Sequence, residues 1–481
     1  MSRIVIIGAG LGGLAAAARL AALGHEIVVL EQAARVGGKL GLLERDDEHG
    51  HWAFDTGPSL LTMPHVLRDL FAATGDPLDT VLALEPTTLP RSRFGDGTVL
   101  APATTREDLL ASLPGDGAAQ WSALLERAGR IWDATHRSFL ESPLDGAGAL
   151  LRLVAGQTRD VRTVAPWQTL RGLGSSYLTD PRLKMMLDRY ATYSGSDPRR
   201  APAALAVVPW VEQTFGAWHV AGGLHHLVDA VRDRAVDRGA VVRTGHDVTA
   251  IERSGGRAGG VRLRGGGTLR ADVVIANADA SHVYGDLVRS PSAIRRLARA
   301  TPSYGGFVAC LALRGANEGL TEHEVSFPAD YDAELDDLAA GRIVSDPTLY
   351  VHRSPGPAGC EQWFVLVNAP RQGQVDWDAD GAAASYADRL LDLLAARGLP
   401  VRDRLLWLEP RTPADLGRAT RAPGGAIYGT SSDGARSAFL RPANRSPVPG
   451  LFLVGGSSHP GGGMPLVMLS AQIVAGLVGA A

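Results

Sequence analysis

Ile4-Val5-Ile6-Ile7-Gly8-Ala9-Gly10-Leu11-Gly12-Gly13 is the stretch that decides the fold, because it runs from an apolar strand into a glycine-rich turn. The alanine-rich segment that follows, as far as Leu23, predicts a helix that begins at this turn. A second apolar strand is predicted from Glu26 to Leu30, and Glu31 follows it directly. A strand, a glycine turn, a helix and a second strand ending in an acidic residue are typical of a Rossmann-like domain that binds a dinucleotide.

The glycines of this turn have distinct physical tasks in such a domain. Gly8 makes the tight turn, Gly10 lets the backbone approach a pyrophosphate, and Gly13 lets the helix pack closely on the strand. The helix N-terminus attracts phosphates, and Glu31 is placed to accept hydrogen bonds from a ribose. A glycine triplet alone could be an ordinary strand-to-helix turn, but here the surrounding parts all stand at the expected spacing.

A second glycine-rich turn lies near the other end of the chain. Leu451-Phe452-Leu453-Val454 predicts an apolar strand that runs into Gly455-Gly456-Ser457-Ser458-His459-Pro460-Gly461-Gly462-Gly463. A helix is predicted from Pro465 to Val478, with proline at its first position. The N–H groups of Leu466 and Val467 would then be free to face the edge of a flavin. Two turns from opposite ends of a chain that meet on one extended cofactor indicate FAD.

Two further segments follow the first turn in sequence. Arg35-Val36-Gly37-Gly38-Lys39 places a cation beside paired glycines, where it could contact the pyrophosphate or be an ordinary solvated surface cation. Phe54-Asp55-Thr56-Gly57-Pro58-Ser59 predicts a tight turn that lies against the flavin or is only a loop. The residues alone leave both pairs of alternatives open.

The composition excludes several classes of protein. With a net charge of −3 and 21% charged residues over 481 residues, the chain has no basic field for nucleic acid. Its two cysteines, Cys310 and Cys360, exclude a disulfide framework but not a single bridge, and we expect them to be reduced. The apolar segments near both ends are interrupted by glycines, prolines or charges, so no transmembrane helix is predicted. We therefore expect a cytoplasmic protein that is at most peripherally associated with a membrane.

We expect an α/β protein whose FAD-binding domain is discontinuous. Residues 1–75, 205–290 and 425–481 are assigned to this Rossmann-like domain, and 205–290 would supply its second strand–helix–strand half. Residues 76–204 are expected to form a helical subdomain that contacts the substrate or a membrane. Residues 291–424 are expected to form an inserted α+β subdomain that binds the substrate, with strands over 306–313 and 363–368 and a helix over 382–397.

A long helical stretch is predicted from Leu150 to Tyr193, and its aromatic and methionine residues allow two interpretations. Apolar residues at helical spacing usually form a core, which is the interpretation we favour. They could instead line an apolar substrate tunnel or face a membrane. The residues concerned are Tyr177, Met185, Met186, Tyr190 and Tyr193.

Over nearly its full length the chain resembles the bacterial phytoene-desaturase-type carotenoid oxidoreductases, a branch of the flavin amine-oxidase superfamily. The most family-specific segment is the end motif from His459 to Pro465, and its Gly462 and Met464 make it more similar to hydroxycarotenoid 3,4-desaturases than to phytoene desaturases. Lys39 stands where that family often has arginine, which keeps the charge and loses the fork geometry. The other matching motifs are the first glycine turn with Glu31, Gly37-Gly38, Phe54 to Ser59 with Met63-Pro64, Asp180-Pro181-Arg182-Leu183, Ala217-Trp218-His219 with Gly222-Gly223, Asn277-Ala278-Asp279, Tyr304-Gly305-Gly306-Phe307, His323 to Tyr331 and Phe439-Leu440-Arg441-Pro442.

The resemblance implies which residues hold FAD. Those implied for the ADP part are Gly8, Gly10, Glu31, Lys39 and the backbone of Val248. Those implied for the ribityl chain and the isoalloxazine are Gly456, His459, Met464, Leu466 and Val467. The full expected set also includes Leu11, Gly13, Gln32, Gly38, Gly57, Pro58 and Ser59. For His459 we favour a backbone contact with the cofactor over a role as general base, and no catalytic residue or metal ligand is identified.

The resemblance also implies the reaction. Desaturation of a polyene removes a hydride and a proton from adjacent carbons, and a flavin can accept the hydride, so a strong base is not required. The partner would be a hydrophobic carotenoid, an acyclic or one-ended C40 polyene, taken from a membrane surface. Three alternatives stay open: an oxygenase or ketolase of the same family, a flavin amine oxidase, and a non-catalytic flavoprotein that binds an apolar ligand. The sequence does not reveal the oligomeric state.

Overall fold

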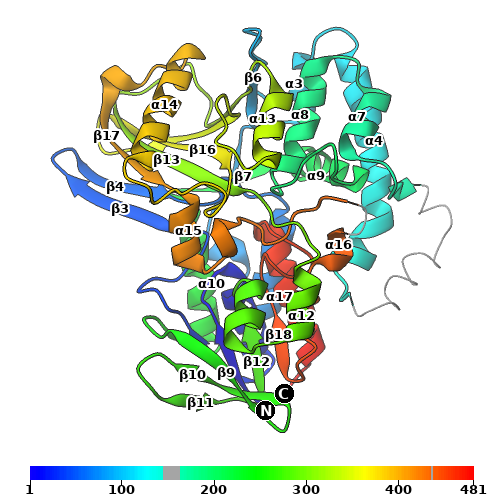
Figure 1. Cartoon of the computed structure of the whole chain (residues 1–481), viewed down its shortest axis with the longest axis vertical. Coiled ribbons are helices and arrows are strands. Elements are labelled where there is room, and N and C mark those ends of the chain that lie inside the picture. Colours follow the sequence, from blue (N-terminus) through cyan, green and yellow to red (C-terminus); the bar gives the residue numbers. More distant parts are fainter. Residues whose placement is uncertain (145–162, 435–436) are drawn as a thin grey trace.

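The computed structural model describes residues 1–144, 163–434 and 437–481, so residues 150–162 of the predicted helical stretch lie outside the described residues. The chain folds into two parts that lie one above the other in Figure 1. The lower part contains a parallel sheet and both ends of the chain, and the upper part contains a larger sheet flanked by helices. The fold is therefore mixed α/β, as predicted.

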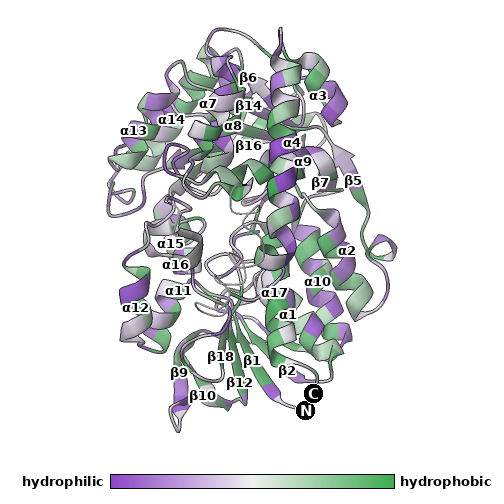
Figure 2. Ribbon diagram, turned by 90° about the vertical axis from the view of Figure 1, so that its right-hand side faces the viewer, coloured by the Kyte–Doolittle hydropathy of each residue, from purple (hydrophilic) through white to green (hydrophobic). Residues whose placement is uncertain are grey.

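The parallel sheet has five strands in the order β18-β12-β1-β2-β8, which are β1 (Arg3–Ile7), β2 (Glu26–Leu30), β8 (Val241–Arg243), β12 (Val273–Ala276) and β18 (Leu451–Leu453). Figure 2 shows that β1, β12 and β18 are largely hydrophobic, as expected for strands buried on both faces. All neighbouring strands run parallel, so their carboxyl ends meet at one edge of the sheet. The glycine turns that follow β1 and β18 therefore lie at the same edge.

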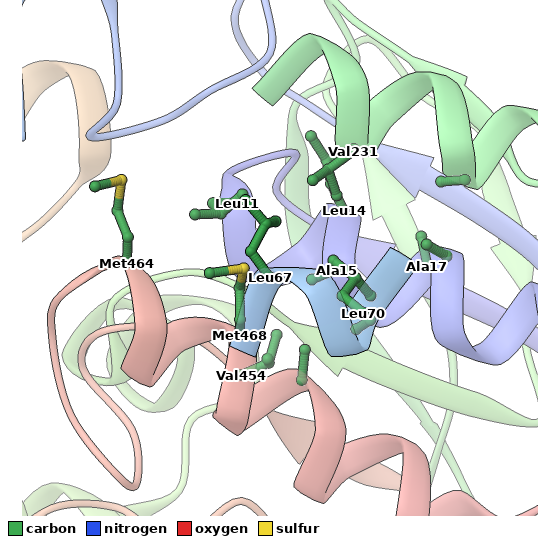
Figure 3. Close-up of a cluster of buried hydrophobic side chains, with 14 of the residues drawn as sticks. Leu11, Leu14, Ala15, Ala17, Leu67, Leu70, Val231, Val454, Met464 and Met468 are labelled. Atoms are coloured by element: carbon green, nitrogen blue, oxygen red, sulfur yellow. The ribbon is translucent and has the colours of Figure 1, made fainter. Parts of the chain in front are cut away.

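The core of the lower part is built around helix α1 (Leu11–Ala22). Three helices surround it, namely α2 (Pro64–Thr74), α10 (His225–Asp237) and α17 (Met464–Val478). Four consecutive alanines of α1, residues 15–18, are completely buried. Because these side chains are small, the neighbouring helices approach α1 closely and fill the space with larger residues. Figure 3 shows this packing, with Leu67 and Leu70 of α2, Val231 of α10 and Met468 of α17 around α1.

Residues 248–270 correct the prediction of a second strand–helix–strand half. They form an antiparallel sheet of three strands, β9 (Val248–Ser254), β10 (Arg257–Leu263) and β11 (Thr268–Arg270). Gly255 and Gly256, both with positive φ, form the two-residue turn between β9 and β10. Such a turn returns the chain directly beside the preceding strand, so an antiparallel sheet and not a helix connects β8 to β12. The helix predicted within 205–290 does form, as α10, but it precedes β8.

The upper sheet has six strands in the order β17-β13-β16-β15-β14-β6, which are β6 (Arg91–Arg93), β13 (Gly305–Arg314), β14 (His323–Ser326), β15 (Leu349–Pro355), β16 (Cys360–Ala369) and β17 (Leu405–Arg411). Strands β13 and β16 contain the two predicted strands. Helix α14 (Ala382–Ala396) contains most of the predicted helix and packs on the sheet through Leu390 and Leu394. Strand β6 pairs with β14 although it comes from the segment 76–204, so that segment also contributes to the sheet.

Helices of the segment 76–204 enclose a second core beside this sheet. They are α3 (Arg106–Ser112), α4 (Gly117–Thr135), α7 (Leu170–Tyr177) and α8 (Pro181–Thr192), and α9 (Val207–Phe215) follows them. Trp121, Leu124 and Leu125 of α4 are completely buried in this core. Within the described ranges, no helix combines the length and the apolar character needed to cross a membrane.

Short elements connect the two parts. Strands β3 (Leu42–Asp47) and β4 (Gly50–Asp55) form a hairpin that leads into the predicted turn 54–59. Strand β5 (Leu84–Thr87) pairs with β7 (Ala217–Val220), which crosses the expected boundary between 76–204 and 205–290. The remaining α-helices of the described residues are α11 (Ala280–His282), α12 (Pro291–Leu297), α13 (Tyr331–Ala339), α15 (Pro413–Thr420) and α16 (Ser437–Leu440).

Candidate active site

One cavity of about 1010 Å³ runs from the carboxyl edge of the parallel sheet into the upper part of the molecule. At the sheet it is lined by Gly8, Gly10 and Gly38, and in the upper part by apolar residues such as Val208 and Phe364. Its volume is at the upper end of the range of about 300–1,000 Å³ for sites that hold one small ligand. The cavity therefore suits an extended ligand, or a cofactor together with a substrate.

Asn277, which follows β12, lies between the two glycine turns. Its side-chain amide donates to the carbonyl oxygen of Gly8 at 3.3 Å. A Cβ on Gly8 would lie 2.5 Å from the carbonyl oxygen of Asn277, and a Cβ on Gly455 would lie 2.5 Å from its Oδ1. Both turns therefore close on Asn277, a residue for which the sequence motifs predicted no individual role.

Almost all residues predicted to bind the cofactor line this one cavity. Gly13 does not, because it lies beneath the turn, where a Cβ would stand 2.2 Å from the carbonyl oxygen of Gly8. His459 is the second exception. The residues that line the cavity as predicted are Gly8, Gly10, Leu11, Glu31, Gln32, Gly38, Lys39, Gly57, Pro58, Ser59, Val248, Gly456, Met464, Leu466 and Val467.

The side chain of His459 is completely buried and does not line the cavity. Its Nε2 is 3.0 Å from the carbonyl oxygen of Ser142, its ring packs edge-on against Phe139, and burial lowers its pKa to about 4. The backbone is also engaged, because the N–H donates to the carbonyl oxygen of Pro442 and the carbonyl oxygen accepts from Asn444 and Ser470. The structure therefore does not support the expected backbone contact of His459 with the cofactor.

The N-terminus of α17 faces the cavity through Met464, Leu466 and Val467. The N–H of Val467 donates to the carbonyl oxygen of Gly463 at 3.0 Å, so the prediction that this N–H is free is wrong. The bond forms because Gly463 directly precedes the helix and supplies the acceptor for its first turn. Val467 can still contact a cofactor through its side chain.

Glu31 is buried at the carboxyl end of β2, where it lines the cavity. Its two carboxylate oxygens accept hydrogen bonds from the N–H groups of Ala9 (2.8 Å) and Ala33 (2.9 Å). These bonds fix the carboxylate at the first glycine turn. Each oxygen keeps acceptor capacity for a further donor, as a ribose hydroxyl would be.

Lys39 is not a solvated surface cation, because its ammonium donates to the carbonyl oxygens of Ala426 (3.2 Å) and Ile427. Burial lowers its pKa to about 8, against the opposing effect of the Asp279 carboxylate. The lysine therefore ties the segment Gly37-Gly38-Lys39 to the loop around residue 427 and places a cation at the cavity wall.

Polar side chains gather in one region of the otherwise apolar upper part of the cavity. Tyr190 donates to Glu212 at 2.5 Å, and the guanidinium of Arg189 lies 4.3 Å from the centre of the Tyr193 ring. Burial raises the pKa of Glu212. Tyr190 and Tyr193 line the cavity whereas Met186 belongs to the second core, so both interpretations of this aromatic stretch hold for part of it.

Residues 11–327 match the protein family described as flavin containing amine oxidoreductase. The chain belongs to this family. The prediction of an FAD-dependent oxidoreductase is thereby confirmed, and FAD is its cofactor.

Curated relatives match this flavin oxidoreductase over nearly their whole length. A 4,4'-diapolycopene oxygenase from Methylomonas sp is 32% identical over 98% of this chain and 97% of its own. A hydroxyneurosporene desaturase from Cereibacter sphaeroides is 34% identical over 98% of this chain and 96% of its own. A 1-hydroxycarotenoid 3,4-desaturase from Flavobacterium sp. is 29% identical over 99% of each chain.

Solved structures of other oxidoreductases share the fold. An oxidoreductase from Methanosarcina mazei has a TM-score of 0.67 at 16% identity, and the match covers 99% of this chain and 100% of that protein's chain. Cyclohexylamine oxidase from Brevibacterium oxydans has a TM-score of 0.63 at 15% identity and covers 99% of this chain and 98% of its own. At such identities the likeness concerns the fold alone.

The bare backbone and the unpaired acceptor at the cavity wall fit FAD. Gly10 and Gly38 present bare backbone beside one another, since a Cβ on Gly38 would lie 3.3 Å from the Cα of Gly10. Asp279 Oδ2 is buried without a hydrogen-bond partner within the described part of the chain, so this wall retains an acceptor for a ligand hydroxyl or N–H. These residues would hold the cofactor, which accepts a hydride when bound.

Arg441 belongs to one of the matching sequence motifs, but no individual role was predicted for it. It joins the C-terminal turn to the loop around residue 429. Its guanidinium donates to the carbonyl oxygens of Tyr428 (3.0 Å), Thr430 (2.7 Å) and Gly456 (2.7 Å). Burial lowers its pKa to about 10, against the opposing effect of Asp279. The arginine therefore fixes the part of the cavity wall that the C-terminal turn and the loop around residue 429 form.

Glu31→Ala is expected to weaken FAD binding by about 1–3 kcal/mol, the cost of losing charge-assisted ribose hydrogen bonds. The check is a titration of the apoprotein with FAD, in which the quenching of flavin fluorescence measures binding. Glu26→Ala at the exposed start of the same strand is the matched control and should leave the dissociation constant unchanged. An unchanged constant for Glu31→Ala would show that this carboxylate serves only Ala9 and Ala33.

Proposed function

We propose that this flavin oxidoreductase introduces conjugated double bonds into an acyclic or one-ended C40 polyene. The observation that carries the proposal is the single cavity that joins the glycine turns to an apolar chamber in the upper part. The proposal is supported by relatives named hydroxyneurosporene desaturase and 1-hydroxycarotenoid 3,4-desaturase, which match along the whole chain.

The residues of the chamber would bind, orient and dehydrate the polyene. Val208, Val211, Phe364 and Leu366 present apolar surface, and each buried CH₂ group of a ligand contributes about 0.8 kcal/mol. FAD, held by the residues at the glycine turns, would supply the hydride acceptor. Since the conjugated chain spreads developing charge, positioning is the main contribution of these side chains.

We further propose that residues 76–204 form the membrane-facing subdomain, beside an FAD-binding domain of 1–75, 205–290 and 425–481 and a substrate subdomain of 291–424. Trp167 is 69% exposed, and its neighbours Val164 and Pro166 line the cavity. An exposed tryptophan suits a membrane interface, because its ring is apolar and its N–H is polar. A polyene would enter here from the bilayer.

With carotenoid-loaded liposomes and FAD, the protein is expected to shift the visible absorbance of a polyene to longer wavelength. Each new conjugated bond should remove two hydrogens, which mass spectrometry of the extracted pigment measures. The panel should include hydroxylated and unhydroxylated acyclic carotenoids, with heat-inactivated protein as control. Turnover of small soluble amines without any spectral shift would identify an amine oxidase instead.

An oxygenase is the second candidate, favoured by the 32% identity to the 4,4'-diapolycopene oxygenase. The same extraction distinguishes the two reactions, because an oxygenase product gains oxygen whereas a desaturase product only loses hydrogen.

A further inference from the structure

A row of buried polar side chains begins at the cavity wall. Ser59 lines the cavity after β4, and its Oγ is 2.6 Å from the hydroxyl of Tyr350 on β15. That hydroxyl is 2.8 Å from Nδ1 of His323 on β14, the strand paired with β15. Ser59 is 7%, Tyr350 8% and His323 0% exposed. Bulk water therefore has little access to this row.

The row continues from His323 to the surface. Nε2 of His323 faces Glu322 Oε1 at 3.8 Å, slightly beyond hydrogen-bond length, and has no other partner among the described residues. The Glu322 carboxylate is 3.5 Å from Nδ1 of His219, whose Nε2 is 3.2 Å from Glu85. The side chain of Glu85 is 54% exposed. The row, which we call the Tyr350 relay, runs from the cavity to solvent through Ser59, Tyr350, His323, Glu322, His219 and Glu85. Hydrogen bonds join Ser59 to Tyr350 and Tyr350 to His323, whereas His323 and His219 stand 3.8 and 3.5 Å from Glu322 without a hydrogen bond among the described residues.

A metal ion is the first alternative for this cluster, because ligand atoms of Glu322, His323 and His352 lie within 4.8 Å of one another. The rings of His323 and His352, however, are stacked at 4.8 Å with only 14° between their planes. The lone pair of an imidazole nitrogen lies in the ring plane, so two stacked rings direct their lone pairs within two separate, nearly parallel planes. Lone pairs in two such planes do not converge on one ion, and the geometry favours hydrogen bonding.

The charges of the relay suit proton transfer. Burial lowers the pKa of His323 to about 3, so its ring is neutral and accepts from Tyr350 at Nδ1 while Nε2–H points at Glu322. Burial acts to raise the pKa of Glu322, but the hydrogen bond from His352 and the neighbouring His323 outweigh it and lower this pKa to about 2. Glu322 is therefore ionised and is the group that faces His323 Nε2 on the solvent side of the row.

We propose that the Tyr350 relay carries the substrate proton from the cavity to solvent. The inference rests on the proposed function, in which each desaturation removes two hydrogens, one as a hydride to FAD and one as a proton from the adjacent carbon. The proton enters at Ser59 Oγ while the hydroxyl proton of Ser59 moves to Tyr350, that of Tyr350 to His323 Nδ1, and that of His323 Nε2 to Glu322. Ser59, Tyr350 and His323 each gain one proton and lose one, and Glu322 loses the proton that it gains by way of His219 and Glu85 to solvent.

The test follows hydride and proton separately in one turnover. FAD-loaded protein is mixed with carotenoid liposomes and a pH indicator; flavin absorbance reports hydride transfer and the dye reports proton release. Tyr350→Phe should bind FAD normally and release the proton about 100-fold more slowly, the lower end of the loss of an acid–base group. Tyr284→Phe is the matched control, a buried tyrosine hydrogen-bonded to Ser446 and outside the cavity, and should behave as wild type.

His323→Gln gives a second, independent reading, because glutamine can still bond to Tyr350 but cannot pass a proton. His323→Gln should slow proton release about as much as Tyr350→Phe does. It keeps the relay testable if Tyr350→Phe fails to bind FAD. Wild-type proton release in His323→Gln would overturn the relay, and so would a stoichiometric metal in the wild type that this variant lacks. A wild-type flavin that responds to no polyene would instead overturn the proposed function and the relay with it.

Discussion

Gly13→Ala is expected to abolish FAD binding and to lower the free energy of unfolding by about 4 kcal/mol or more, the range reached when a core must be forced apart. The new Cβ would lie 2.2 Å from the carbonyl oxygen of Gly8 and 3.0 Å from the Cβ of Asn277. The first of these atoms is backbone, so α1 must move away from β1. The turn that faces the cofactor would move with it.

The matched control for Gly13→Ala is Gly476→Ala, also within a helix. Gly476 lies in α17, is exposed, and a Cβ there would meet nothing within 4 Å. Alanine should therefore stabilise the protein, by about 0.5–1 kcal/mol, through its better helix propensity. Urea unfolding and an FAD titration measure both variants, and equal effects of the two substitutions would contradict the packing role of Gly13.

Arg441→Ala is expected to destabilise the protein by about 3 kcal/mol or more, because buried acceptors that lose their donor cost about 1–3 kcal/mol each. The carbonyl oxygens of Tyr428, Thr430 and Gly456 would all lose their donor. Since Gly456 and Tyr428 line the cavity, FAD affinity should fall as well. Chemical unfolding of the apoprotein and the FAD dissociation constant are the measurements.

Arg402→Ala is the control for the loss of an arginine. Arg402 pairs with Asp388 and Asp392 on the surface, where ion pairs contribute about 0–1 kcal/mol. Its removal should leave FAD binding unchanged. If Arg441→Ala were as mild as Arg402→Ala, the three carbonyl contacts would not be what fixes the loop.

The sequence predicted the features that depend on neighbouring residues. Strand β1, helix α1, strand β2 and Glu31 follow one another at a spacing with a physical reason, and the structure has each of them. The same holds for β13, β16 and α14, whose apolar periodicities are continuous.

What the sequence could not predict depends on contacts between distant segments. Asn277 fills the space between the turns only because β12 lies between β1 and β18. The antiparallel course of 248–270 was missed because apolar strands read alike in either direction, and the glycine pair at 255–256 was the available signal. The contact of His459 with Asn444 and Ser470, and the relay from Ser59 to Tyr350 across 291 residues, exist only in the folded chain.

The strand order β18-β12-β1-β2-β8 has a consequence for how the protein is made on the ribosome. Strand β1 emerges first, yet one of its edges stays unpaired until β12 has been synthesised, and β12 in turn waits for β18. Exposed apolar edges promote aggregation in a nascent chain. The wall that Gly456 contributes is synthesised long after the first glycine turn, so a growing chain cannot complete its flavin site before residue 456 has emerged. Cells that make this enzyme should therefore depend on chaperones to shield β1 during elongation, and flavin should bind only once both turns have been made.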